Sequence, residues 1–443
     1  MRRSSLRILA LLLPFALGCA THADKLKDIR ATYHSGNLGS THAQLDAAIA
    51  KKGRDADVLK LDKATALLSE GKPREAEVLF RELRDKFDAL DGKDAQEQIA
   101  SMLTDDQRLA YAGEDHEKVL IRFYLSLCNL LQNGSDASAY ALQVNQKQQQ
   151  IIDRGAGVGP DGKNLKQGYK LVASGAYLHA ALREETHANY DDVARSLQQV
   201  AQWQPEFSPI KADIERAMNG RHSAPGHGVV YVFAMVGRGP IREERMEIVS
   251  TVSLLIADRM ITALGKQSLP PTIAPIKVPR AVKVPNSVDS VLVVQGGKAL
   301  GRTQTLTDIG TMAVQQSDAR LPEAVARAVV RRVVKKGIVY GAKEAIGTDK
   351  NQLASVALDV AGVVWEATEA ADTRCWGLLP DKIQVLRIEL PAGEHELNLQ
   401  AIGSGIHGSP ESVRVTVADG RNSYVVANYP GMKAVGTINV SKP

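Results

Sequence analysis

Two short serine–lysine pairs are the first residues whose types and spacing could support nucleophilic catalysis. In Ser69-x-x-Lys72 and Ser208-x-x-Lys211, a lysine follows a serine at a spacing where its amine could take the hydroxyl proton. The first pair falls in a turn between helices, and the second lies beside two prolines. Neither is followed by a Ser-Asp-Asn or Lys-Thr-Gly motif, so we expect no catalytic role for them.

Other motifs of catalytic or cofactor chemistry are missing from the sequence. The ten histidines are scattered, and neither His-Glu-x-x-His nor Cys-x-x-Cys occurs. There is no Gly-x-Ser-x-Gly elbow and no phosphate-binding loop. His395 stands in the stretch 393–397, which is more typical of a solvated hairpin turn than of a metal site. We therefore expect no metal, no cofactor and no enzyme; a hydrolase remains the alternative if distant residues converge.

A glycine-rich turn at 237–240 is a sharper candidate, for binding an anion. Its glycines would let the backbone approach a ligand, and Arg238 could pair with a negative group, with Arg242 and Arg245 nearby. The alternative is a hairpin turn that exposes its arginines to solvent, which the pattern favours.

The stretch 324–346 predicts a helix with separated polar and apolar faces. Arg327, Arg331 and Lys335 recur every four residues and therefore share one face, opposite a side rich in alanine and valine. Such a face could lie on anionic lipid or on an acidic protein partner. A solvated face on a packed helix is the favoured alternative, because the apolar side lacks Trp, Phe or Leu.

The first nineteen residues predict the cellular location of the protein. Three arginines precede a ten-residue apolar run at 8–17 and small residues close it, as in a secretory signal over 1–18. Cys19 follows those small residues in a pattern that resembles the lipobox of bacterial lipoproteins. The resemblance implies cleavage before Cys19 and acylation of its thiol, with 19–23 as a lipidated tether. Ala20, in place of aspartate, implies export to the Gram-negative outer membrane, with the protein facing the periplasm.

Removal of the signal changes the charge of the chain. The full sequence carries a net charge of +5, and the three arginines of 1–18 leave with the signal, so the mature side chains sum to +2. This balance gives little support for nucleic-acid binding. Cys128 and Cys375 remain far apart in the sequence, and two buried free thiols are expected rather than a disulfide.

Helical periodicity with polar turns extends over 24–220. Gly36 and Gly71 lie 35 residues apart, close to the roughly 34-residue period of tetratricopeptide repeats. After Gly71, Ala76 would allow close helix packing, while Phe80 and Leu83 fill the same face. Two looser copies follow, so we expect a tetratricopeptide-like domain; an irregular helical bundle is the alternative.

Beyond a glycine-rich linker at 219–228, the pattern changes to strands. The apolar run 229–236 predicts a buried strand, and 241–248 predicts its partner. We expect β-rich segments at 226–320 and 372–443, the latter an antiparallel sandwich. Between them, 321–371 predicts a helical hairpin with Pro322 in its first turn and 353–370 as its second helix. The expected fold class is multidomain: α-helical repeats, then an antiparallel α+β region with this hairpin inserted.

Several segments together resemble a family of uncharacterised bacterial outer-envelope lipoproteins with tetratricopeptide-like N-terminal halves. The likeness rests on Cys19, on Glu-Lys-Val-Leu-Ile-Arg at 117–122, on the 237–240 turn, and on 371–380 with its Ala-Asp-Thr-Arg-Cys-Trp. It implies architecture and location without catalytic residues. Because stacked repeats form a concave surface, we expect an envelope adaptor or scaffold that holds a protein partner in a repeat groove. A regulator of cell-wall synthesis or outer-membrane assembly is the alternative.

Overall fold

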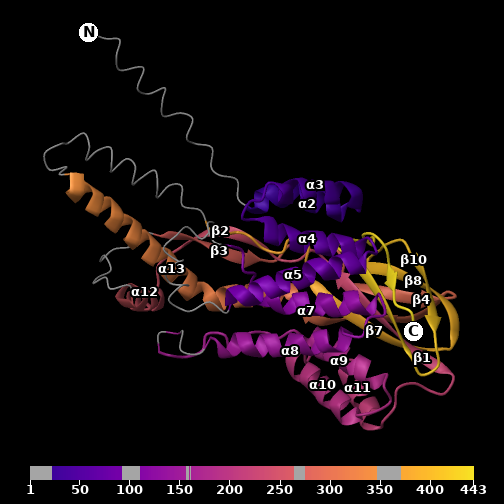
Figure 1. Cartoon of the computed structure of the whole chain (residues 1–443). Coiled ribbons are helices and arrows are strands. Elements are labelled where there is room, and N and C mark those ends of the chain that lie inside the picture. The colour runs from indigo at the N-terminus through magenta and orange to yellow at the C-terminus, as the bar shows by residue number, and fades with distance from the viewer. Residues whose placement is uncertain (1–21, 92–109, 156–158, 160, 264–274, 347–370) are drawn as a thin grey trace.

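The computed structural model describes residues 22–91, 110–155, 159, 161–263, 275–346 and 371–443 (Figure 1). The signal, Cys19 and most of the tether lie outside the described residues. The first half comprises α2 (His22–His34), α3 (Leu38–Ala50), α4 (Ala56–Ser69), α5 (Pro73–Asp91), α7 (Asp115–Leu130), α8 (Ala137–Asp153), α9 (Ala173–Glu184), α10 (Tyr190–Trp203) and α11 (Ile210–Met218). None of the described helices combines the length and hydrophobicity that crossing a membrane requires.

The second half mixes strands and helices. It comprises β1 (His227–Val236), β2 (Ile241–Glu247), α12 (Thr251–Ala263), β3 (Ile276–Val282), β4 (Ser290–Gln295), β5 (Lys298–Arg302), β6 (Gln304–Asp308) and α13 (Ile309–Ile346). The strands β7 (Lys382–Pro391), β8 (Gly393–Gly403), β9 (Ile406–His407), β10 (Glu411–Val417), β11 (Asn422–Tyr429) and β12 (Asn439–Val440) follow. The chain is therefore a mixed α and β protein, as its sequence pattern predicts.

The helices from α2 to α11 pack in chain order, each against the next. The turns within the pairs α2–α3, α4–α5, α7–α8 and α9–α10 contain a left-handed residue, respectively Gly36, Gly71, Asn133 and His187. This conformation ends a helix and reverses the chain, and glycine adopts it without the steric cost that a side chain adds. The helix turns expected at the first two positions are present.

Helix α5 shows the faces that its sequence predicts. Ala76, Phe80 and Leu83 are fully buried. Asp85 points to solvent, with 64% of its side chain exposed. The small Ala76 side chain therefore lies where helices meet, and the acidic residue lies on the opposite face.

Strand β1 is the central strand of the molecule and is buried on both faces. Alternate side chains point to opposite faces of a strand. One set joins the core beneath the helices: Val229, Tyr231, Phe233 and Met235. The other set joins a second core between two sheets: Val230, Val232, Ala234 and Val236. This arrangement explains why the strand reads as an unbroken apolar run.

Two sheets form a sandwich with the helices covering one outer face (Figure 1). The first sheet has the order β12-β11-β1-β7-β6, and the second has the order β10-β8-β4-β5. The expectation of an antiparallel region is wrong for one pair, because β1 and β11 run parallel. Both sheets combine strands from 226–320 and 372–443, so these two segments share one sandwich instead of forming separate units.

The predicted pairing of 241–248 with the preceding strand is wrong. Strand β2 pairs instead with β3, forming a two-stranded ribbon in which Ile241 lies opposite Val282. With α12 and α13, this ribbon encloses a third apolar core of its own. We call β2, β3, α12 and α13 the arm; it extends from the body on the side away from the sandwich (Figure 1).

Helix α13 also differs from expectation, because it begins at Ile309 and contains Pro322 in its interior. Its start is fixed by Asp308, whose carboxylate accepts the Thr311 N–H at 2.7 Å, as helix-capping side chains do. The predicted boundary at 320/321 therefore falls inside one helix. The expected second helix at 353–370 lies outside the described residues.

The helical layer and the first sheet share one continuous core. Trp376, which precedes β7, is fully buried between Phe80 and Tyr124, with ring centroids 5.5 and 5.1 Å away. Its indole nitrogen donates to Thr65 Oγ1 at 2.9 Å. The face of the helical array where a repeat groove was expected is thus covered by the protein's own sheet and by the segment leading into β7. Residues 24–220 are part of a larger folding unit.

Candidate functional site

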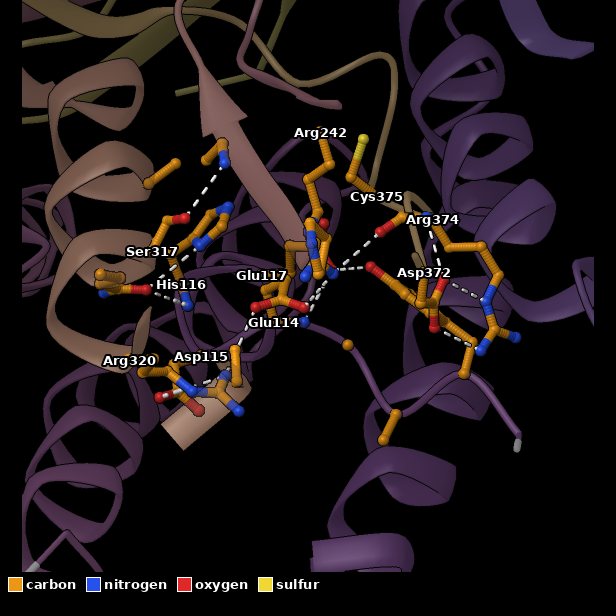
Figure 2. A pocket seen from close by; sticks show the side chains of 18 of the residues that line it. Glu114, Asp115, His116, Glu117, Arg242, Ser317, Arg320, Asp372, Arg374 and Cys375 are labelled. Carbon is orange, nitrogen blue, oxygen red and sulfur yellow. Dashed lines mark hydrogen bonds and ion pairs between the residues drawn. The ribbon is translucent and has the colours of Figure 1, made fainter. Parts of the chain in front are cut away.

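A cavity of about 610 Å³ opens where α7 begins (Figure 2). Its walls come from the segment before α7, the first turn of α7, the β2–β3 ribbon, α13 and the segment 371–376. Nine Lys or Arg and six Asp or Glu side chains line it. The cavity therefore lies at the junction of the arm and the helical layer, and its lining is dense in charge with an excess of cations.

Glu117 ties three of these walls together. The residue is fully buried, and its Oε1 accepts the Trp376 N–H at 2.7 Å. Its Oε2 accepts the Glu114 N–H at 2.9 Å and a hydrogen bond from the Tyr111 hydroxyl. A buried carboxylate is stable only when such donors surround it. Glu117 thus fixes the segment at 371–376 against the start of α7.

An ion-pair network crosses the cavity from α7 to the arm (Figure 2). Glu114 pairs with Arg242 of β2 and, at 3.4 Å, with Arg320 of α13. Asp115 pairs with Lys166 at 2.9 Å and with Arg320 at 3.9 Å. Burial opposes ionisation of both acids, but the surrounding cations outweigh it and lower the pKa of Glu114 and of Asp115. The two acids are therefore charged and paired.

A second pair lies on the wall formed by 371–376. Arg374 donates to Asp372 at 2.6 and 2.9 Å and lies over the Tyr111 ring, 5.4 Å from its centroid. Burial opposes the charge of Arg374, yet its bonds to Asp372 raise the pKa of the guanidinium. Two hydrogen bonds to one carboxylate hold the planar guanidinium in a fixed orientation.

The structure brings together two of the cationic residues that the sequence singles out. Arg327 and Arg331 both line the cavity. Arg327 pairs with Glu323 one turn earlier, and Arg331 is buried with 3% of its surface exposed. The expectation of a solvated basic face is therefore wrong for Arg331, because the surrounding protein buries it, whereas Arg327 keeps 27% of its side chain exposed in the cavity. Lys335 belongs to α13, but its side chain lies outside the described residues.

Arg238 is separate from this site. It is exposed in the loop after β1 and is not part of the cavity lining. Its backbone N–H donates to Asn286 Oδ1 at 2.6 Å, which holds the loop in place. The turn follows a central strand that pairs on both sides with β7 and β11, so it is not a hairpin turn between β1 and β2.

The two serine–lysine pairs form no catalytic dyad. Ser69 Oγ is buried and shares a hydrogen bond of 2.8 Å with the Tyr33 hydroxyl, while Lys72 pairs with Glu70 at 3.2 Å. Ser208 donates to Gln304 at 2.6 Å. The Ser69 hydroxyl thus joins two helices, and the Ser208 hydroxyl joins the turn before α11 to β6.

His395 is likewise held by structural hydrogen bonds. It lies in β8, and its ring nitrogens contact Gln295 and the Pro391 carbonyl at 2.7 Å each. Among the described residues, no group of three His, Cys, Asp or Glu side chains is arranged to hold a metal ion.

The cavity also contains a histidine, a serine and a cysteine, which are residue types used in nucleophilic catalysis. Their contacts do not form a catalytic arrangement. His116 Nδ1 lies 3.2 Å from Gln316 Oε1, and Ser317 Oγ accepts the Ala281 N–H at 3.1 Å. Cys375 is a free thiol whose pKa is raised by burial, which keeps it protonated. Cys128 is also buried and free, as expected. The geometry fits ionic recognition better than nucleophilic catalysis.

Behind the cavity wall, Asp62 should make stability depend on pH. It is fully buried, its Oδ1 accepts the Leu378 N–H at 2.9 Å, and burial raises its pKa to about 7. The folded protein thus favours the protonated acid more than the unfolded chain does. Stability is therefore expected to fall as the pH rises from about 4 to above 7, by up to roughly 4 kcal/mol.

Asp62→Asn retains an acceptor for Leu378 and cannot ionise. Thermal melts of both proteins between pH 5 and pH 8 should show a fall in melting temperature for the original chain that is largely removed in the variant. Parallel curves for the two proteins would show that Asp62 stays ionised in the fold.

The sequence drew attention to the segments 117–122 and 371–376 but did not assign ionic roles to their side chains. The acidic run Glu-Asp-His-Glu at 114–117 is the signal that could have found the network, since acids gather at helix N-termini. Their cationic partners lie on distant segments and have no common sequence pattern. No family model, no curated protein and no solved structure matches this chain in the comparisons made.

Proposed function

We propose that this protein is a lipid-anchored adaptor of the bacterial cell envelope that takes an acidic segment of a protein partner into the charged cavity. In this proposal the lipid is carried by Cys19, and the protein faces the periplasm from the outer membrane. The helix pairs act as a tetratricopeptide-like scaffold that positions the cavity. The proposed adaptor function requires no enzyme activity, no cofactor and no nucleic acid.

The observation that carries the proposal is the charge of the cavity. Its nine Lys or Arg side chains exceed its six Asp or Glu side chains, so an entering carboxylate would meet a positive field. The volume lies within the range of ligand-binding pockets and could hold a few side chains of a peptide. Arginine also binds carboxylates in a directed, two-point manner, which supports selectivity for acidic residues.

The location of the partner site differs from the repeat groove that the sequence suggests. The sheet covers the helical face that would form such a groove, through residues including Tyr231 and Phe233. A partner could reach that face only by separating a continuous apolar core, which costs far more than binding returns. The cavity is open without any such rearrangement.

Arg327→Gln tests the proposal. Arg327 lines the cavity and has 27% of its side chain exposed, so the change removes a cation without creating a large void. Loss of one charge-assisted hydrogen bond should weaken partner capture about tenfold or more. Capture should be measured with the full lipidated protein in crosslinked envelopes.

Arg195→Gln is the matched control, because Arg195 lies on α10 with 73% of its side chain exposed and is not part of the cavity lining. It should leave capture unchanged. Equal capture by both variants, at equal melting temperatures, would contradict a role for the cavity.

A further inference from the structure

Half of the exposed large hydrophobic residues in the described part of the chain come from one ten-residue stretch. Met246, Ile248, Val252 and Leu255 are 61, 84, 36 and 51% exposed, and the described residues contain eight such side chains. The other four are dispersed over α5, α8, the end of α11 and β9. We call 246–255 the apolar tip of the arm; it covers the end of β2 and the first turns of α12.

The local fold forces this exposure. Helix α12 turns Ile256, Ala257 and Ile261 into the core that it shares with α13 and β3. Val252 and Leu255 are three residues apart and therefore share a different face, which is directed outward. Among the described residues, Val252 and Leu255 are not part of the apolar core that packs the arm.

The tip belongs to the same end of the molecule as the proposed lipid anchor. Helix α2 packs against β2, and its first residue, His22, lies 3.4 Å from Asp55. From Cys19 to His22 the chain can span at most roughly 10 Å. An acylated Cys19 would hold the start of α2 close to the bilayer surface, and β2 of the arm packs against this helix.

The β2 strand runs from the region that packs against α2 to the apolar tip. Glu244, in the middle of β2, accepts the Ala371 N–H at 2.8 Å. Residues 246 and 248 follow along the strand, and each residue advances the chain by about 3.3 Å. Met246 and Ile248 thus lie within roughly 15 Å of Glu244 and of the segment 371–376 that it contacts.

We propose that the apolar tip inserts into the lipid surface and gives the protein a second point of membrane contact. The occupant is a bilayer because the tether leaves the start of α2 within reach of one; this step rests on the proposed lipid anchor. Ser250, Thr251 and Arg245 border the apolar side chains and would meet the headgroups, as polar residues do in interfacial helices. Two contacts would fix the orientation of the cavity relative to the membrane.

The test uses the full lipidated protein in vesicles of phosphatidylethanolamine and phosphatidylglycerol. An environment-sensitive fluorophore is placed at Ile248→Cys, and in a matched control at Ile406→Cys, which is 60% exposed in β9 of the sandwich. Both remaining native thiols are buried. At position 248 we expect a several-fold rise in emission, a blue shift and quenching by spin-labelled lipid, and at position 406 none of these.

Leu255→Gln in the labelled protein is expected to reduce the inserted fraction about tenfold, the worth of one buried leucine. A polar signal at position 248 in protein that floats with the vesicles would overturn the inference and leave the anchor intact. If emission rises with protein concentration in the absence of lipid, the tip contacts a second copy of the protein. That result would also overturn the inference. Mass spectrometry of the N-terminus tests acylation separately; its absence would remove the proposed function and this inference together.

Discussion

Ala76→Arg is expected to unfold the helical layer. Ala76 is fully buried in α5, and an arginine there would overpack the contact between helices and bury an unpaired charge. Overpacking and a buried charge together cost about 5 kcal/mol, which is the whole stability of many domains. Because this layer shares its core with the first sheet, we expect loss of the cooperative thermal transition for the entire described body.

Asp85→Arg is the control on the same helix. Asp85 is exposed and pairs with its neighbour Arg84 at 2.8 Å, an interaction that contributes little at a surface. The variant should retain its stability to within about 1 kcal/mol. Similar melting temperatures for the two variants would mean that the faces of α5 are assigned wrongly.

Cys19→Ala is expected to release the protein from the membrane. The proposed anchor needs the thiol of this residue, and alanine cannot form a thioether. Each buried methylene of an acyl chain contributes about 0.8 kcal/mol, so removing several chains lowers membrane partitioning by many orders of magnitude. The apolar tip alone should hold only a small fraction of the protein. Membrane fractionation of cells that produce the variant measures this directly.

A processed, membrane-bound form that persists unchanged in Cys19→Ala would contradict the lipid anchor. Cys128→Ala provides the control, because this thiol is free and buried within α7. Its fractionation should equal that of the original protein.

Local patterns predict the elements of this fold well. The spacing of Gly36 and Gly71 predicts two helix turns, and the apolar run at 229–236 predicts a buried strand; both are present. Gly296 and Gly297 between two apolar runs also predict a hairpin, and β4 pairs with β5 across them. In each case a short stretch of the sequence carries the signal.

The sequence does not predict which distant strands pair with each other. Strand β2 carries charges on both faces, and its seven residues suit a ribbon with β3 as well as a sheet with β1. Strand β11 lies parallel to β1 although almost two hundred residues separate them, and no local signal marks that choice. Which strand each of them pairs with is decided by packing in the complete fold.

The same limit applies to the site. Arg327 and Arg331 stand out as a basic stripe, but only the fold places both in the lining of the cavity and buries Arg331 there. Glu114 meets Arg242 and Arg320 across 128 and 206 residues of sequence. A stripe on one helix indicates that a charged face exists; only the fold determines whether solvent, lipid or protein covers it.

Site-specific photo-crosslinking tests the central claim, that an acidic partner segment enters the cavity, most directly. A photoreactive residue at Ala324, which lines the cavity, is compared in intact envelopes with one at Val78, which is 62% exposed on α5. Position 324 should give a discrete adduct with a protein whose crosslinked peptide is rich in Asp or Glu, and Arg327→Gln should reduce that adduct about tenfold. An adduct from position 78 with none from position 324, or a crosslinked peptide without acidic residues, would contradict the account.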